Sequence, residues 1–415
     1  MRKFWTSISR NSRICLAVEP LWALFGPATF FFGPLYMKDI GLSELEMGLI
    51  NSLATAASFV FFTLSGPITN KLGRKKTTLY FDFLAWPVAM VLWGMASGFW
   101  WFLVAAILNS LVRIVQVSWN LLLVEDSAPE HRVTIFGICG ILGGIGGFVT
   151  MGTGFLRDSL GLIPVMRTLY LVGAVSMSAM IIIRHALCRE TANGVAMMER
   201  FRHHSLLRAA RVQLAHFFEA SRDRQFINIA ALYTLMNASQ AFSFFQILYL
   251  KNHLHYGERD IALIPGINAL LIILLLVLVL PRLPQRGERR GLVLSFLGSA
   301  LASLLFVALP SGNLILALFI NALAAAAFQI LAAFREAVFM NHSSEEQRAG
   351  LYGLVQTLAM LFTIPAGWLA GWFYTLNPVA PFVANACIFT AGLLISLGIR
   401  QPDPAPEVVA ATIPQ

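Results

Sequence analysis

Charged side chains are scarce in this chain. Asp, Glu, Lys and Arg make up only 12% of its 415 residues, whereas 57% of the residues are hydrophobic. Ordinary soluble domains carry about 25% charged residues, so this composition excludes a chain whose surface faces water throughout. A mean hydropathy of +0.71 agrees with that conclusion. The sequence therefore predicts an integral membrane protein.

Cysteine is rare as well. The four cysteines are Cys15, Cys139, Cys188 and Cys387, and their wide spacing fits neither a zinc site nor a disulfide framework. We expect them to be packing residues. We expect no metal site and no other cofactor.

Motifs for covalent chemistry and for nucleotide hydrolysis are missing. The sequence contains no His-Glu-x-x-His motif, no nucleophile elbow, no phosphate-binding loop and no paired intramembrane aspartates. These absences argue against a membrane-embedded enzyme and against an ATP-driven pump. A net charge of +9 would suggest nucleic-acid binding in a soluble protein, but here the cations lie in short loops between apolar runs. Membrane orientation explains them better, and no nucleic-acid partner is expected.

Long apolar runs are what the chain has in abundance. Twelve of them are long enough to cross about 30 Å of hydrocarbon as helices. They cover residues 14–36, 44–66, 77–97, 99–123, 133–156, 163–187, 225–250, 259–280, 291–309, 313–340, 348–374 and 378–399. We therefore predict an all-α membrane protein with twelve transmembrane helices.

The cations are distributed unevenly between the two sides of this twelve-span arrangement. Of the 30 Lys and Arg residues, 23 fall on the side of the two termini and 5 on the other side, while Arg113 and Arg335 lie within spans. Cytoplasmic loops of membrane proteins carry the excess of Lys and Arg. We expect a multi-pass protein of the cell (inner) membrane with both termini in the cytoplasm.

The stretch 188–224 separates six spans from six more. Its amphipathic pattern is typical of a helix that lies at the membrane interface, and its histidines are expected in a solvated loop. The predicted organisation is an N-terminal bundle at 1–187, a cytoplasmic linker at 188–224, a C-terminal bundle at 225–400 and a flexible tail at 401–415.

The two halves also resemble each other in sequence. SAPEHRVTIFG at 127–137 matches SSEEQRAGLYG at 343–353 with an offset of 216, and LGRKK at 72–76 matches RGERR at 286–290 with an offset of 214. Two matches at nearly equal offsets indicate a duplicated six-helix unit.

A basic turn between the second and third spans carries a family signature. Its residues are Gly66, Asn70, Lys71, Gly73, Arg74 and Lys75. In this pattern the chain resembles the major facilitator superfamily of secondary transporters. The resemblance implies two pseudo-symmetric six-helix bundles, and it implies that the turn helps to latch a cytoplasmic gate. We expect Gly73 to shape the turn and its cations to anchor helix ends and to bond carbonyls of a neighbouring helix.

The chain departs from the family pattern in three places. Asn70 stands where the family usually has aspartate, so a hydrogen bond would replace a charge in the latch. In the fourth span Arg113 and Gln116 match a second signature, but Val117 replaces its glycine. The fifth span is rich in glycine but lacks the glycine–proline pair of proton antiporters, so antiport is less well supported than transport.

The fourth span carries the best candidate for a binding site. Asn109, Arg113, Gln116 and Asn120 form a polar stripe at helical spacing. Arg113 lies near the middle of the span, where a charge costs a few kcal/mol and marks a functional candidate. The resemblance implies that spans seven and ten also line the passage, which adds Asn237, Gln240, Asn321 and Gln329. For each amide, a hydrogen bond that only joins helices is an equally open reading.

Four further charges lie just inside the cytoplasmic ends of their spans. They are Glu19, Asp82, Arg335 and Glu336. One interpretation is a set of pairs that closes the cytoplasmic mouth, with Glu19 as the proton carrier because burial favours a protonated carboxyl group. The alternative for Asp82 and Arg335 is snorkelling toward the headgroups.

These features predict a secondary active transporter that moves a small organic solute by alternating access, with proton coupling as one option. The alternatives are a facilitative carrier without ion coupling and a transporter-like membrane sensor that moves nothing. The expected partners are an anionic or polar small molecule, protons if transport is coupled, and the lipid bilayer. A monomer is expected.

Overall fold

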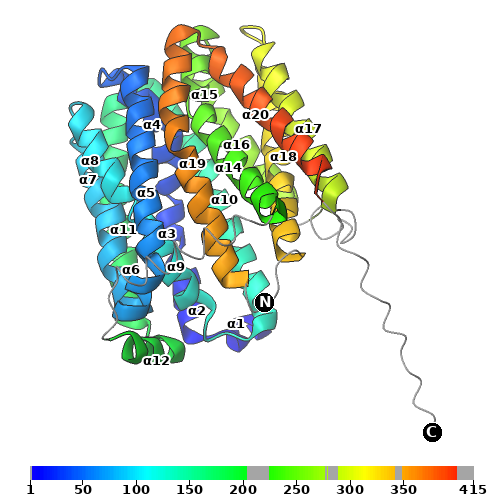
Figure 1. Ribbon diagram of the computed structural model, residues 1–415. Coiled ribbons are helices and arrows are strands. Elements are labelled where there is room, and N and C mark those ends of the chain that lie inside the picture. Colours follow the sequence, from blue (N-terminus) through cyan, green and yellow to red (C-terminus); the bar gives the residue numbers. More distant parts are fainter. Residues whose placement is uncertain (1, 203–223, 276–277, 279–287, 342–347, 400–415) are drawn as a thin grey trace.

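The computed structural model describes residues 2–202, 224–275, 278, 288–341 and 348–399. Within these ranges the chain is helical and contains no strand (Figure 1). Nine helical stretches of the described chain are long and apolar enough to cross a membrane by length and composition. The all-α membrane fold is therefore confirmed.

The N-terminal half supplies six rods, several of them built from more than one helix. A short α1 (Arg2–Ser7) precedes them. The rods are α2–α4 (Arg10–Val18, Pro20–Ala23, Gly26–Asp39), α5 (Glu44–Leu72), α6–η1–α7 (Arg74–Phe83, Leu84–Val88, Ala89–Gly94), α8–α9 (Phe99–Asn109, Val112–Val124), α10 (Pro129–Leu160) and α11 (Leu162–Leu187). Each of them corresponds to one predicted span.

The C-terminal half repeats this arrangement after α12 (Ala192–Phe201). Its rods are α14–α15–η2 (Arg224–Ser243, Gln246–Leu248, Tyr249–His253), α16 (Glu258–Leu274), α17 (Glu288–Val307), α18 (Leu314–Asn341), α19 (Arg348–Leu376) and α20 (Ala380–Leu397). Twelve rods in two halves agree with the predicted two-bundle architecture.

Helix breaks interrupt several rods of the N-terminal half, some at prolines and one at Ser110. Proline lacks a backbone N–H and breaks the helical ladder, which accounts for the new start at Pro20 and for the π-helical turn around Pro87. The break at Ser110 has no proline. There the Ser110 hydroxyl donates to the carbonyls of Ala54, 2.9 Å away, and of Ala106, 2.8 Å away. This break lies one turn before Arg113 and separates the predicted polar stripe into two helices.

The helix bundle has two ends, which we call the Glu44 end and the Arg74 end after a residue at each. The Glu44 end holds the start of α5, and the Arg74 end holds α1, α12 and the turn between α5 and α6, at the bottom of Figure 1. The two halves contact each other through two pairs of helices: α5 packs along α19, and α10 packs along α16.

The halves meet most closely at the Glu44 end, where glycines bring helix backbones together. A Cβ added at Gly48 would lie 2.5 Å from the carbonyl oxygen of Gly367 and 3.0 Å from the Cα of Gly371. The backbone N–H of Trp368 donates to the Ser52 hydroxyl at 2.7 Å. Small residues at such contacts are typical of membrane helices, which associate by close packing.

An ion pair reinforces the same end. Arg157 on α10 pairs with Glu258 at the start of α16, and Lys251 lies 2.9 Å from the same carboxylate. The guanidinium of Arg157 also lies over the ring of Phe32, 4.7 Å from its centroid.

Contact between α10 and α16 loosens toward the Arg74 end. A Cβ at Gly147 would lie 2.6 Å from both the Pro265 carbonyl and the Ala269 side chain, whereas a Cβ at Gly137 would have nothing within 4 Å. In α5, Gly66 is equally free of neighbours. The halves therefore converge at the Glu44 end and diverge toward the Arg74 end.

Parts of several predictions lie outside the described residues. These parts are most of the amphipathic linker (203–223), the basic loop at 281–287, the repeat segment at 342–347 and the tail at 401–415.

The close approach of α10 to α16 can be tested with a leucine at Gly147. We expect Gly147→Leu to lower the unfolding temperature of the purified protein, because overpacking typically costs about 1–3 kcal/mol. Gly137→Leu on the same helix is the matched control and should leave that temperature unchanged. Equal effects of the two substitutions would contradict the described contact between the halves.

Candidate functional site

A polar cavity of about 500 Å³ lies between the two halves and is called the central cavity here. The N-terminal half contributes Asn51, Thr55, Ser58 and Arg113. The C-terminal half contributes Asn237, Gln240, Phe244, Arg335, Gln356 and Thr363. Both halves therefore share one polar space deep in the bundle.

Arg113 reaches this cavity from the first turn of α9. The only described hydrogen bond of its side chain is a long one, from Nη1 to Oε1 of Gln116 at 3.4 Å. Its Nε is buried without a hydrogen-bond partner, and no ion pair to it is found among the described residues. A guanidinium removed from water is costly unless a counter-charge reaches it. The geometry favours an anion as that counter-charge.

Arg335 lies in the wall of the same cavity. Its Nη2 lies 2.7 Å from Oε1 of the neighbouring Glu336, and its guanidinium covers the ring of Tyr233 at 3.9 Å from the centroid. Its charge is therefore partly compensated within its own half. The structure thus places Arg335 beside the central cavity together with Arg113.

Three smaller cavities adjoin the central one. The N-half cavity, about 320 Å³, shares Arg113, Asn51 and Phe244 with it. The bridging cavity, about 350 Å³, shares Gln240 and Phe244 with it, and the C-half cavity, about 410 Å³, shares Gln240. The four cavities are thus neighbours that share lining residues from one half to the other.

The predicted amides occupy different parts of this space. Asn237 lines the central cavity, Gln329 lines the C-half cavity, and Gln240 lines both. Asn109 lines the N-half cavity, although its amide donates to the carbonyl of Ala85 at 2.8 Å. Asn109 therefore has a structural partner in its own half.

The other two members of the stripe lie further toward the Arg74 end. Gln116 is exposed and accepts the bond from Arg113, and Asn120 is half-buried. The stripe is not one continuous helical face, because the break at Ser110 separates Asn109 from the rest.

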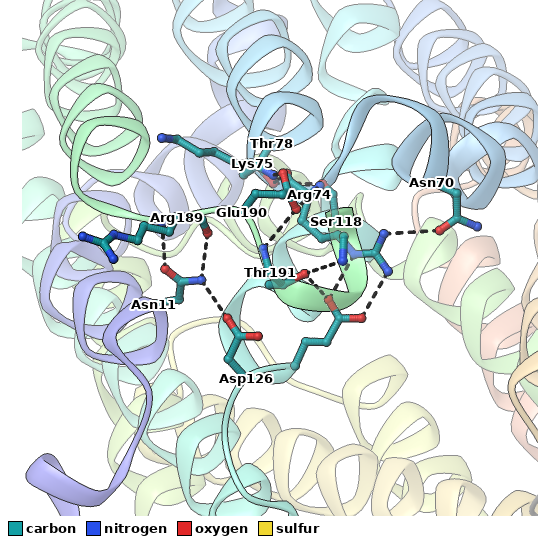
Figure 2. Close-up of polar contacts among 12 residues, drawn as sticks. Asn11, Asn70, Arg74, Lys75, Thr78, Ser118, Asp126, Arg189, Glu190 and Thr191 are labelled. Atoms are coloured by element: carbon teal, nitrogen blue, oxygen red, sulfur yellow. Dashed lines mark hydrogen bonds and ion pairs between the residues drawn. The ribbon is translucent and has the colours of Figure 1, made fainter. Parts of the chain in front are cut away.

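A second polar cluster surrounds the basic turn at the Arg74 end (Figure 2). Arg74 is buried and binds Glu125 with two hydrogen bonds of 3.1 Å, one from Nε and one from Nη2. Its Nη1 also donates to Oδ1 of Asn70 at 3.4 Å. A bidentate pair of this kind is both strong and directional. The partner of Arg74 is thus a carboxylate, and the expected helix carbonyl is not among its described bonds.

Glu190 completes this cluster by capping α6. Its carboxylate accepts the backbone N–H groups of Arg74 and Lys75 at 2.9 and 3.0 Å. Free amides at a helix start favour a negative charge. Figure 2 also shows Asn11 joined to Asp126 and Arg189, which ties α2 to the same cluster.

Gly73 makes this turn possible. It adopts φ +83°, a conformation that suits glycine. A Cβ there would lie 2.6 Å from Glu190 Oε2 and 2.7 Å from Met198 Sδ. The expectation that Gly73 shapes the turn agrees with this geometry. Lys71, in contrast, is exposed.

Asp82 does not lie at the predicted cytoplasmic mouth between the halves but inside the N-terminal half. It is 2% exposed and pairs with Arg184 of α11, which belongs to the same half. Counting along the sequence assigned Arg184 to the loop cations, but the structure buries it inside the N-terminal bundle. Glu19 lies at the break between α2 and α3 and is half-buried. Among the described residues Asp82 pairs with Arg184 and Arg335 with Glu336, so neither pair joins the two halves across the predicted cytoplasmic mouth in this state.

Several site residues were missed in the sequence. Glu125 and Glu190 follow the ends of the fourth and sixth spans, where acidic residues look like ordinary loop positions. The available signal was their place at the same membrane face as the basic turn. Asn51 and Gln356 carried no signal beyond an amide within an apolar run.

The fold and the cavity together define the class of protein. Twelve rods form two halves around a shared polar cavity that is sealed at one end by backbone contacts and an ion pair. This is the architecture of a membrane transporter.

Comparisons with known proteins identify the family. A model of the Major Facilitator Superfamily matches residues 21–286 and, in a second match, residues 227–414. The chain belongs to the Major Facilitator Superfamily. It is 24% identical over 377 residues to an uncharacterized MFS-type transporter of Methanocaldococcus jannaschii, covering 87% of this chain and 88% of that protein.

Solved structures share the fold at low sequence identity. The nucleoside transporter NupG matches with a TM-score of 0.71 and 14% identity, over 94% of this chain and 98% of that one. The human organic anion transporter MFSD10 matches with a TM-score of 0.66 and 16% identity, over 93% of this chain and 99% of that one.

The contribution of the Arg74–Glu125 pair can be measured directly. We expect Arg74→Gln to lower the free energy of unfolding by about 3–5 kcal/mol, because it leaves a buried carboxylate without its partner. Lys76→Gln is the control, since Lys76 is exposed in the same turn. Chemical unfolding in detergent would give both values, and equal losses would show that the pair adds no stability.

Proposed function

We propose that this chain is a secondary transporter that moves a small organic anion across the membrane by alternating access. One observation carries the proposal. Arg113 is a deeply placed cation in a cavity shared by both halves, and among the described residues no carboxylate neutralises it. A substrate anion supplies the missing charge.

The two halves are proposed to rock about this cavity. Converging helices close the Glu44 end, and the Arg157–Glu258 pair joins the halves there. If the excess of Lys and Arg places the Arg74 end in the cytoplasm, the described state is open inward. In this proposal, substrate release into the cytoplasm or capture from it takes place in this state, and breaking the contacts at the Glu44 end opens the other side.

The cluster around Arg74 is proposed to hold the N-terminal half as a rigid unit during this motion. All of its described partners belong to the N-terminal half or to the segment that follows it. The family resemblance implies a latch that joins the two halves. Such a latch would require an additional contact, formed in the state in which the Glu44 end is open. Gly66 and Lys71, which are open in the described state, are candidates for that contact.

Proton coupling through Glu19 is a further part of the proposal. Glu19 is a carboxyl group at the break between α2 and α3, in the same half as the buried pair of Asp82 and Arg184. The alternatives are a facilitative carrier without ion coupling and a sensor that moves no solute. The names of the structural neighbours, an organic anion transporter and a nucleoside transporter, are compatible with an organic substrate.

Uptake by proteoliposomes tests the transport proposal. The full-length protein is given a mixed panel of organic anions, and accumulated solutes are identified by mass spectrometry. We expect wild type to accumulate at least one anion and Arg113→Gln to lose about tenfold or more of that uptake, as expected for a lost bond to a charged group.

Arg167→Gln is the matched control for this experiment. Arg167 donates to the carbonyl of Ala96 at 3.3 Å and lies outside the central cavity. Its loss should leave uptake unchanged. Normal uptake by Arg113→Gln would exclude the proposed anion site, and a wild type that moves no solute would favour the sensor.

The coupling proposal is tested with a pH gradient. We expect an imposed gradient to change net uptake by wild type, and Glu19→Gln to abolish that response while exchange of substrate across the membrane persists. Uptake that ignores the gradient in wild type would identify a facilitative carrier. A response that persists in Glu19→Gln would assign proton carriage to another group.

A further inference from the structure

The C-half cavity differs in chemistry from the central cavity. It lies among α14, α16, α17, α18 and α20 and has a volume of about 410 Å³. Ten of its eighteen lining residues carry an amide or a hydroxyl group, and none of the eighteen is charged. Four others are phenylalanines. Its walls therefore suit an uncharged polar group that also offers a flat or apolar face.

Three oxygen atoms in this wall are buried without a hydrogen-bond partner among the described residues. They are Oδ1 of Asn268, Oδ1 of Asn385 and Oγ of Ser299. Ser299 is 2% exposed and Asn385 is 6% exposed, so their polar atoms are shielded from bulk water. Buried polar atoms are normally paired, and each unpaired one costs free energy. The three oxygens belong to three different helices, α16, α17 and α20, and to residues that line one cavity, so this wall holds acceptors that the described residues leave unpaired.

A local contact orients one of these side chains, and a second differs from the neighbouring serine of its helix. Nδ2 of Asn385 donates to the Ser243 hydroxyl at 3.1 Å, which leaves its Oδ1 directed elsewhere. Ser303, one turn from Ser299 on α17, differs from it because its hydroxyl donates to the Ser299 carbonyl at 3.0 Å. The unpaired state of Ser299 is therefore not a general property of serines in this wall.

A chain of amides fixes another acceptor. Nδ2 of Asn321 donates to the carbonyl of Ala317 at 2.8 Å, so its Oδ1 must point away from that carbonyl. Nε2 of Gln246 donates to this Oδ1. One N–H of the Gln246 amide is used in this way, so its second N–H and its carbonyl oxygen remain for a ligand. The acceptors of this wall are the three unpaired oxygens of Asn268, Asn385 and Ser299.

The C-half cavity adjoins the anion site. Gln240 lines the C-half, bridging and central cavities, and Arg113 lines the central cavity. The arrangement would let a single substrate place a charged group near Arg113 and an uncharged group on the far side of Gln240, in the C-half cavity. The two cavities together fall in the range of volumes typical of small-molecule sites.

We propose that the C-half cavity is the subsite for the uncharged part of the substrate, and that this part carries several O–H or N–H donors on a ring or other flat body. This inference rests on the proposed transport of an organic anion. It narrows the substrate class to anions with a donor-rich neutral body, since Arg113 binds the charge while Asn268, Asn385 and Ser299 accept the donors.

Matched triads of solutes test this inference. Each triad holds a donor-rich anion, an anion of the same skeleton without donors, and the donor-rich neutral compound. Glucuronate, tetrahydropyran-2-carboxylate and glucose form one such triad. Thermal stabilisation of the full-length protein and uptake into proteoliposomes are measured for every member.

The donor-rich anion is expected to give the largest stabilisation and uptake in the triads to which the protein responds. A response to donor-free anions that equals or exceeds it would overturn the subsite while leaving anion transport intact. Transport of neutral members alone would overturn the requirement for an anion as well. Absence of uptake for every solute, in this panel and in the mixed anion panel, would remove the proposed function and this inference together.

Variants then localise the effect. For a transported donor-rich anion, we expect Ser299→Ala and Asn385→Leu each to raise KM by about two- to tenfold, as for one lost neutral hydrogen bond. Ser396→Ala is the control, because Ser396 lies on α20 outside the C-half cavity and its hydroxyl donates to the carbonyl of Gly392 at 2.7 Å. The donor-free anion of the same triad should be unaffected by all three. Equal effects on both anions, or an equal effect of Ser396→Ala, would overturn the assignment.

Discussion

The cost of a charge within a membrane-spanning bundle governs this structure. In hydrocarbon every buried ion must find an opposite charge or a set of hydrogen bonds. Arg74 pairs with Glu125, Arg184 with Asp82, and Arg157 with Glu258. Arg113 is the exception among these deeply placed arginines, because the described bonding of its side chain is limited to one long contact with Gln116. The three pairs hold protein segments together, and the fourth cation is the one that we propose for binding a substrate.

The paired arginines also differ in whether they join the two halves or lie within one half. Arg74–Glu125 and Arg184–Asp82 lie within the N-terminal half, and they stiffen it from inside. Arg157–Glu258 crosses from one half to the other at the Glu44 end. A rocking motion would have to break the crossing pair, whereas the internal pairs can persist. In the proposed motion, the internal pairs would keep the N-terminal half rigid, and the crossing pair would hold the Glu44 end closed until it breaks.

The sequence predicted the spans well because a run of apolar residues and its length carry the signal. The sequence also singled out Gly73, by its position in a basic turn, and Arg113, by its depth in a span. The ion-pair partners of the charged residues could not be predicted, because the depth of a residue along a helix does not say toward which neighbouring helix its side chain points. Asp82 was therefore grouped with Arg335, although it faces Arg184. The helix break at Ser110 could not be predicted, because no proline marks it in the sequence. The unpaired Asn268 and Asn385 looked like the many amides that merely join membrane helices.

The glycine contacts between α5 and α19 have a consequence for how the Glu44 end separates. At Gly48, Gly367 and Gly371 the touching surfaces are main chain, so few rotatable groups are frozen when they meet. Ordering a long side chain costs up to about 2 kcal/mol of entropy, and glycine adds no such side-chain cost. Parting and rejoining at this seam therefore needs little reorganisation of side chains, whereas at the other seam, between α10 and α16, the salt bridge of Arg157 with Glu258 must also break.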